Sequence, residues 1–68
     1  MDESVSWLAR ELGALREERN LPRQDFSIMC GKYEQWWGRI ETGYTNPTLD
    51  DIDIAAGALG YELHAMVP

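Results

Sequence analysis

This 68-residue chain contains one cysteine, one histidine and no long hydrophobic run. A single cysteine, Cys30, cannot form an internal disulfide, which is typical of a protein from a reducing cytoplasm. No apolar run approaches the roughly 20 residues that a membrane-spanning helix needs, and the N-terminal MDESVSW lacks the basic region of a secretory signal. We therefore expect a cytoplasmic protein that has no membrane partner.

Residues that support catalysis or metal binding are equally scarce. With His64 as the single histidine, the chain offers no convincing Ser–His–Asp set, no metal-ligand spacing and no glycine-rich phosphate loop. The carboxylates Asp50, Asp51 and Asp53 lie near the start of an expected helix, where negative charge favours the helix dipole more than it indicates a cation site. We expect no enzyme activity, no cofactor and no metal.

Basic residues are few as well, since 6 Lys and Arg stand against 12 Asp and Glu, a net charge of −6. Taken alone, this acidity argues against a nucleic-acid partner, because binding to phosphates favours Lys and Arg. The charge is uneven, however: residues 1–18 carry −3 and residues 47–68 carry −4, whereas residues 19–46 carry +1. A nucleic-acid interface is therefore expected only in the middle of the chain.

Four helices are expected from apolar residues that repeat at helical spacing and from residues that begin or end helices. The expected ranges are about 4–19, 22–30, 33–41 and 48–59. The apolar residues expected to face the core are Val5, Leu8, Leu12, Leu15, Phe26, Met29, Cys30, Trp37, Ile40, Leu49, Ile52, Ala56 and Leu59. Gly31, Gly43 and Gly60 follow three of these helices and suit the left-handed conformation that closes a helix.

The end of the chain has a different pattern from the helix that precedes it. Thr48 and Asp51 have the spacing of a capping box, which starts that helix. In the segment 61–67 the residues on one side are Tyr61, Leu63, Ala65 and Val67, and this alternation predicts a short β-strand. A lone strand needs a partner, and a domain of this size buries only about 60% of its unfolded surface. We therefore expect a homodimer.

The segment KYEQWWGRIETG, residues 32–43, stands out because two tryptophans are adjacent. Two short helices joined by a glycine turn over 22–41 form a helix-turn-helix pattern. The motifs LREERNLPRQDF, Gly31, RIETG, NPTL and ALG follow one another in the order and spacing of one family. In these motifs, from about Leu12 to Leu63, the sequence resembles the phage-repressor-like (Cro/C1 or XRE-type) DNA-binding domains. The resemblance implies an all-α fold, a four-helix lambda-repressor-like helix-turn-helix domain, followed here by the short C-terminal β-strand.

The resemblance also implies roles for the polar residues of the middle segment. In the family, the Arg of LREER pairs with the Glu of RIETG, which predicts a structural ion pair between Arg16 and Glu41. The third helix of such domains enters the major groove through its N-terminal part. Contacts to DNA bases are predicted for Glu34, Gln35, Trp36 and Arg39. Contacts to DNA phosphates are predicted for Arg23, Lys32, Tyr33, Tyr44, Thr45 and Asn46.

The two tryptophans are expected to differ. Trp37 takes the place of a buried aliphatic residue of the family and is expected in the core, where the small residues Ser27 and Cys30 make room for it. Trp36 is expected on the surface, where it contacts a thymine methyl group, contacts a protein, or lies flat on its own helix. Glu34 departs from the neutral or basic residues common in the family, and we expect it to weaken DNA binding by repelling phosphate.

The tail ALGYELHAMVP resembles the antitoxin-type repressors of this family, in which a C-terminal strand pairs with its mate across a two-fold axis. The predicted dimer interface consists of Ile54, Ala58, Tyr61, Leu63, Ala65 and Val67. The leading hypothesis is a sequence-specific regulator of transcription, acting mostly as a repressor. It would bind an inverted repeat in double-stranded DNA as a symmetric dimer, in the cytoplasm of a bacterium or of the bacterial host of a phage.

The alternative hypothesis is a helix-turn-helix-derived module or inhibitor that binds a protein and not DNA. It rests on the acidity of the chain, on Glu34, and on the expected exposure of Tyr33, Trp36 and Tyr44. Within the leading hypothesis, an antitoxin with a toxin partner and a phage or prophage regulator both remain open.

Overall fold

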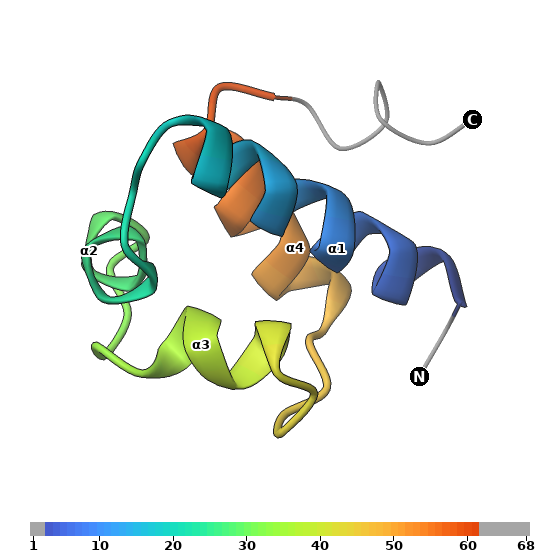
Figure 1. Ribbon diagram of the computed structural model, residues 1–68. Coiled ribbons are helices and arrows are strands. Elements are labelled where there is room, and N and C mark those ends of the chain that lie inside the picture. Colours follow the sequence, from blue (N-terminus) through green and yellow to red (C-terminus); the bar gives the residue numbers. More distant parts are fainter. Residues whose placement is uncertain (1–2, 62–68) are drawn as a thin grey trace.

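The computed structural model describes the backbone of residues 3–61 and the side chains of residues 7–61. The described backbone contains four helices, which are α1 (Glu3–Glu18), α2 (Arg23–Met29), α3 (Trp36–Glu41) and α4 (Leu49–Ala58). Figure 1 shows their arrangement, in which α1 packs against both α4 and α3, and α2 packs against α3. The expected helical class is confirmed for these residues. The predicted strand at 61–67 lies, apart from Tyr61, outside the described part of the chain.

A tight turn separates α2 from α3. Gly31 has a φ of 75°, and its N–H donates to the Ile28 carbonyl over 2.9 Å. The next N–H, from Lys32, donates to the Ser27 carbonyl over 3.0 Å. These two bonds form a Schellman motif, which needs a residue in the left-handed conformation and so favours glycine. The sequence prediction that Gly31 ends the second helix is confirmed, and the chain can turn at once towards α3.

The core is a single cluster between the four helices. Its buried apolar residues are Leu8, Ala9, Leu12, Phe26, Trp36, Trp37, Ile40, Ile52, Ala55, Ala56 and Leu59. The ring of Phe26 meets the ring of Trp37 edge to face, with centroids 5.3 Å apart. Trp37 is fully buried, as the sequence predicts. Ser27 lies beside it in the core, and its hydroxyl accepts a hydrogen bond from the Trp37 backbone N–H over 2.9 Å.

Two residues expected in the core are exposed. Leu49 is 60% exposed, because the first turn of α4 lies at the edge of the core, where residues 48–50 are all open to solvent. Met29 is 53% exposed, because the inner face of α2 is formed by Phe26 and Ser27. At about 100° per residue, Met29 lies well round the helix from that face.

Trp36 is buried, so the prediction of an exposed Trp36 that contacts a DNA base is wrong. It is 6% exposed, its ring lies against that of Trp37 at a centroid distance of 5.5 Å, and the Lys32 ammonium lies 5.6 Å from its ring centroid. The sequence prediction took only Trp37 and Ile40 as the inner residues of this helix, but Trp36, Trp37 and Ile40 together span an arc of about 100°. The prediction failed because the core covers this whole arc of α3, and all three residues are buried.

The start of α4 follows the sequence prediction. The Thr48 hydroxyl accepts from the Asp51 N–H over 3.1 Å, and the Asp51 carboxylate accepts from the Thr48 N–H over 2.9 Å. The capping box is therefore confirmed, and it fixes where the loop after α3 ends. This loop, residues 42–48, borders the outer side of α3, where the polar residues of the middle segment gather.

Candidate nucleic-acid interface

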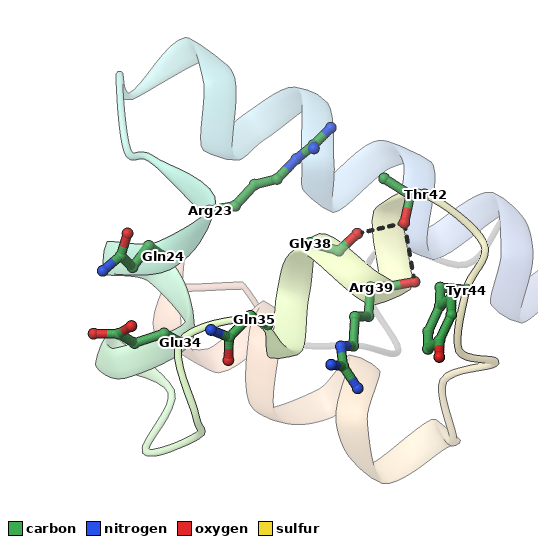
Figure 2. A pocket seen from close by; sticks show the side chains of 8 residues that line it. All are labelled: Arg23, Gln24, Glu34, Gln35, Gly38, Arg39, Thr42 and Tyr44. Carbon is green, nitrogen blue, oxygen red and sulfur yellow. Dashed lines mark hydrogen bonds between the residues drawn. The ribbon is translucent and has the colours of Figure 1, made fainter.

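The outer face of α3 lines a hollow of about 610 Å³ that is open to solvent (Figure 2). Its lining residues come from the start of α2, the turn before α3, α3 itself and the loop after it: Arg23, Gln24, Glu34, Gln35, Gly38, Arg39, Thr42 and Tyr44. We call this hollow the α3 groove. All the side chains in it carry a charged or hydrogen-bonding group. Gly38 contributes no side chain, and the Cδ atom of Arg23 lies 3.6 Å from the place that a Cβ would take there. The groove thus presents polar groups from four neighbouring segments.

The α3 groove collects some of the residues that the sequence predicts to contact DNA and leaves others out. It includes Arg23, Glu34, Gln35, Arg39 and Tyr44. Those outside its lining are Lys32, Tyr33, Trp36, Thr45 and Asn46. Among the latter, Thr45 and Asn46 are exposed in the loop after α3, and Lys32 is half-buried above the Trp36 ring.

Three residues of the groove, Gln24, Gly38 and Thr42, are not among the predicted DNA contacts. Thr42 had a signal, because Gln35, Gly38, Arg39 and Thr42 follow one another at spacings of three and four, which places them on one side of a helix. Its hydroxyl donates to the Gly38 carbonyl over 2.8 Å, so it also helps to close α3 (Figure 2). Gln24 had no such signal, because it belongs to another helix and only the packing of α2 on α3 brings it to the groove.

Arg39 lies close to two tyrosine rings. Its guanidinium carbon is 5.7 Å from the ring centroid of Tyr33 and 5.2 Å from that of Tyr44. Tyr33 comes from the turn before α3 and Tyr44 from the loop after it, and both rings are exposed, by 52% and 77%. An exposed guanidinium over an aromatic face gains about 0.5–1 kcal/mol. Arg39 is therefore held at the groove without an ion pair among the described residues.

Next to the groove, Glu41 at the end of α3 binds two arginines. Arg16 of α1 donates from Nε to Oε1 over 2.7 Å and from Nη2 to Oε2 over 3.1 Å. Arg23 of α2 donates from Nε to Oε2 over 2.7 Å. The Arg16 side chain is only 7% exposed, and its Nη1 donates to the Leu21 carbonyl over 2.6 Å. The structure thus contains the Arg16–Glu41 pair that the sequence predicts, and it adds Arg23 to that pair.

This network changes the acidity of Glu41. Burial by itself raises the pKa of the Glu41 carboxyl, but hydrogen bonds from Arg16 and Arg23 and the charges of both guanidinium groups outweigh burial. The pKa of Glu41 is therefore lowered from its ordinary value of 4.5. The Arg23 side chain remains 48% exposed despite its bond to Glu41. Its guanidinium is thus anchored at one nitrogen and open to solvent at the edge of the α3 groove.

Residues 7–66 match the family described as a helix-turn-helix domain. The chain belongs to this helix-turn-helix family. The comparisons with curated proteins and with solved structures found no match. Membership of the helix-turn-helix family supports DNA as a partner and a regulatory role for the chain.

The helix-turn-helix motif of the domain is α2, the turn at Gly31, and α3. In such motifs the second helix lies in the major groove and the first crosses the DNA backbone. The α3 groove is formed by the outer face of that second helix and by the start of the first one, at Arg23 and Gln24. Charged and amide side chains are therefore exposed on the side of the helix-turn-helix that faces DNA in this family.

The predicted dimer residues of this helix-turn-helix domain lie away from the groove, in α4 and after it. Ile54 and Ala58 are half-buried and pack against the core. Tyr61 is 39% exposed, and the guanidinium carbon of Arg19 lies 5.6 Å from its ring centroid. The other predicted interface residues, Leu63, Ala65 and Val67, lie outside the described part of the chain. The dimer interface therefore stays a prediction.

Two further features bear on the expectations from composition. Cys30 is half-buried, and burial raises the pKa of its thiol more than the charge of Lys32 lowers it. It packs against the core as a small apolar residue would.

Within residues 3–61, none of the helices is long and apolar enough to cross a membrane.

Proposed function

We propose that this helix-turn-helix protein is a sequence-specific regulator that represses transcription by occluding a promoter. It binds an inverted repeat in double-stranded DNA as a symmetric dimer, in the manner of the Cro/C1 or XRE-type repressors, and it has no enzyme activity. The observation that carries the proposal is the α3 groove, where charged and amide side chains gather around the outer face of the second helix of the motif.

The chemistry of each side chain suggests its role in the complex. Gln35 can form a bidentate contact with adenine, and Arg39 can form one with the O6 and N7 atoms of guanine. Glu34 can accept a hydrogen bond from the amino group of cytosine. Arg23 and Lys32 are proposed to contact phosphates, since phosphate contacts set the position of the protein on the duplex without reading sequence.

The distribution of charge also supports the α3 groove as the surface that binds DNA. The groove contains Arg23 and Arg39 against the single carboxylate Glu34, whereas the chain as a whole carries −6. Because phosphates repel the rest of the protein, we expect modest affinity for each protomer and a requirement for two protomers on one site. Dimerisation doubles the base contacts without making the chain more basic.

A module that binds a protein in place of DNA is less well supported by the structure. That hypothesis depended on three exposed aromatic residues, and Trp36 is buried in the core. The remaining two, Tyr33 and Tyr44, are both within 5.7 Å of Arg39 and so have a role within the chain. The choice between an antitoxin and a phage or prophage regulator depends on gene context.

The proposal is tested by selecting duplexes from a random-sequence DNA library with the purified protein at low salt. We expect enrichment of an inverted repeat, and an affinity for the selected duplex that falls as salt rises. Arg39→Ala should cost about 1–3 kcal/mol at particular base pairs, whereas Arg23→Ala should weaken all sequences alike and lower the salt slope by about one. Arg10→Ala, on the exposed side of α1, is the matched control.

The contrary result is equally clear. If wild-type protein enriches no sequence from the library at low salt, sequence-specific DNA binding is excluded for this chain, and the protein-binding module becomes the leading hypothesis.

A further inference from the structure

Tyr33 and Tyr44 are the two most exposed aromatic residues among the described side chains, and the fold does not use them as core. They are 52% and 77% exposed, and they approach the same guanidinium from the two ends of α3. Neither ring is needed to fill space, and neither hydroxyl forms a hydrogen bond among the described residues. Both rings contact the guanidinium group of Arg39.

We propose that Tyr33 and Tyr44 act as a clamp that positions Arg39 to read guanine, and that this clamp sets the sequence preference of the α3 groove. The inference rests on the proposed function, and it adds which side chain dominates recognition and why. Tyr33 and Tyr44 are positioning residues in this account, because they act on the base through Arg39.

The first argument concerns entropy. A free arginine side chain populates many rotamers, and ordering such a side chain on binding costs about as much as one useful contact gains. Contacts of the guanidinium with two rings reduce those rotamers before DNA arrives. Arg39 should therefore lose less entropy in forming a two-bond contact with guanine, and wrong bases should gain nothing from the arrangement, because they lack the matching pair of acceptors.

The second argument concerns the hydrogen-bond donors of Arg39. Arg16 and Arg23 both give donors to the Glu41 carboxylate, so part of their hydrogen-bonding capacity is used within the protein. Arg39 is held by aromatic rings, which attract the cation without a carboxylate taking its N–H groups. Of these three arginines, Arg39 is the one whose position is restrained while its donors stay available to a base.

The third argument is position. Arg39 lies on the outer face of α3, together with Gln35 and Gly38, and Figure 2 shows its side chain beside the ring of Tyr44. Gly38 adds no side chain between Gln35 and Arg39, and the Cδ atom of Arg23 packs 3.6 Å from the place that its Cβ would take. A guanidinium anchored there faces the base edges that the second helix of such a motif meets in the major groove.

The clamp makes a different prediction from the phosphate contacts that the sequence suggests for the same two tyrosines. A phosphate contact depends on the hydroxyl, whereas the clamp depends on the ring. The double substitution Tyr33→Phe with Tyr44→Phe keeps both rings and removes both hydroxyls. The double substitution Tyr33→Leu with Tyr44→Leu removes both the rings and the hydroxyls and keeps apolar side chains. Comparing the two variants therefore separates the effect of the rings from that of the hydroxyls.

The experiment compares two DNA duplexes. The first is the duplex that wild-type protein selects from a random library. The second has the same sequence with 7-deazaguanine at one position, which is the guanine for which Arg39→Ala has lost its preference. The ratio of the two dissociation constants measures recognition of the guanine N7. We expect the phenylalanine variant to keep this ratio within about twofold of wild type and the leucine variant to reduce it about three- to tenfold. The proton NMR chemical shifts of the Arg39 side chain in the DNA-free protein should differ from wild type in the leucine variant only.

Each outcome decides between distinct conclusions. A wild-type protein that selects no sequence overturns the proposed function itself. A wild-type protein that selects a guanine read by Arg39, with an unchanged ratio in the leucine variant, overturns the clamp and leaves the proposed function intact. Equal losses in the phenylalanine and leucine variants also overturn the clamp, because the hydroxyls would then be the active groups. Circular dichroism of both variants confirms that the exposed substitutions leave the fold in place.

Discussion

The adjacent residues Trp36 and Trp37 are both buried, because the core covers an arc of α3 wide enough to include both. Trp36 and Trp37 lie on the two flanks of Ile40, and all three are buried. The pair is therefore a structural unit, with Lys32 lying above the outer of its two rings. Trp36 would be a poor choice on an exposed surface, and its place in the core explains why a tryptophan stands there.

Trp36→Ala should therefore destabilise the fold. Replacing a buried tryptophan by alanine removes packing and leaves a cavity, at a cost of about 3–5 kcal/mol. Urea denaturation measures the free energy of unfolding of this variant. Tyr44→Ala is the control, since Tyr44 is 77% exposed and its loss should change that free energy by about 0.5 kcal/mol or less. Equal stabilities of the two variants would place Trp36 on the surface after all.

Arg16→Ala should destabilise the protein much more than Arg10→Ala. Arg16 is buried, and removing it leaves Glu41 short of one partner and the Leu21 carbonyl without its donor. Breaking a buried pair costs about 3–5 kcal/mol, and the remaining Arg23–Glu41 bond should keep the loss near the lower end. Arg10 is exposed, where a charge contributes about 0–1 kcal/mol. Melting temperatures that coincide for the two variants would contradict this prediction.

Glu41 should make the stability of the fold depend on pH in the acidic range. Its folded pKa is lowered from the ordinary 4.5, so its ionised form contributes stability that is present above 4.5 and is lost as the pH falls through the folded pKa. Glu41→Gln should therefore be less stable than wild type near neutral pH, and the difference should shrink as the pH falls below 4.5 and through the folded pKa. Urea denaturation at several pH values measures this, with Glu11→Gln on exposed α1 as the control.

At the scale of elements, α3 is short and depends on its neighbours for its position. The Ser27 hydroxyl on α2 accepts the Trp37 N–H at the start of α3, and Glu41 at the other end binds α1 and α2 through their arginines. Both ends of α3 are thus tied to other helices by buried or half-buried polar groups. The angle between α2 and α3 follows from these bonds and from the turn at Gly31.

Gly13, in the middle of α1, is explained by this arrangement. A Cβ at Gly13 would lie 3.0 Å from Oε1 of Glu41, so any larger residue would displace the carboxylate that Arg16 binds. Gly57 in α4 has no atom within 4 Å of an added Cβ. Gly57→Ala should stabilise the fold by about 0.5–1 kcal/mol through helix propensity, whereas Gly13→Ala should lose that gain to the displaced carboxylate. Thermal unfolding of both variants tests this, and an equal gain in both would show that Glu41 adjusts freely.

At the scale of the whole molecule, charge is separated along the chain. Residues 1–18 carry −3 and residues 47–68 carry −4, while residues 19–46, which contain the α3 groove, carry +1. Such a protein gains little affinity for DNA from its overall charge. The proposed function therefore draws its affinity from specific contacts and from the binding of two protomers to one site.

Removal of residues 62–68 should convert the dimer into a monomer. The truncation keeps Tyr61, whose ring contacts Arg19, and so leaves the described packing of the protomer in place. Sedimentation equilibrium should show half the mass of the full chain's assembly, and affinity for a duplex with two half-sites should fall to that for one. A truncated chain that still sediments as a dimer would place the interface elsewhere, with Ile54 and Ala58 as the first residues to examine.

The sequence by itself determined the helical class, the Gly31 turn, the capping box at Thr48 and the partners in the Arg16–Glu41 pair. These features depend on local spacing or on motifs that a family shares, so the order of residues is enough to predict them. Local spacing also contained a signal for Thr42, although the prediction did not use it.

Only the tertiary structure decided that Trp36 is core, that Arg23 joins the Glu41 network, and that two tyrosine rings contact Arg39. The reason is that each depends on which segments pack against α3, and the spacing of residues within α3 does not contain that information. The other helices set how wide an arc of α3 the core covers, and so whether Trp36 is included. The packing of α2 on α3 brings together Arg23 and Glu41, which lie 18 residues apart in the chain.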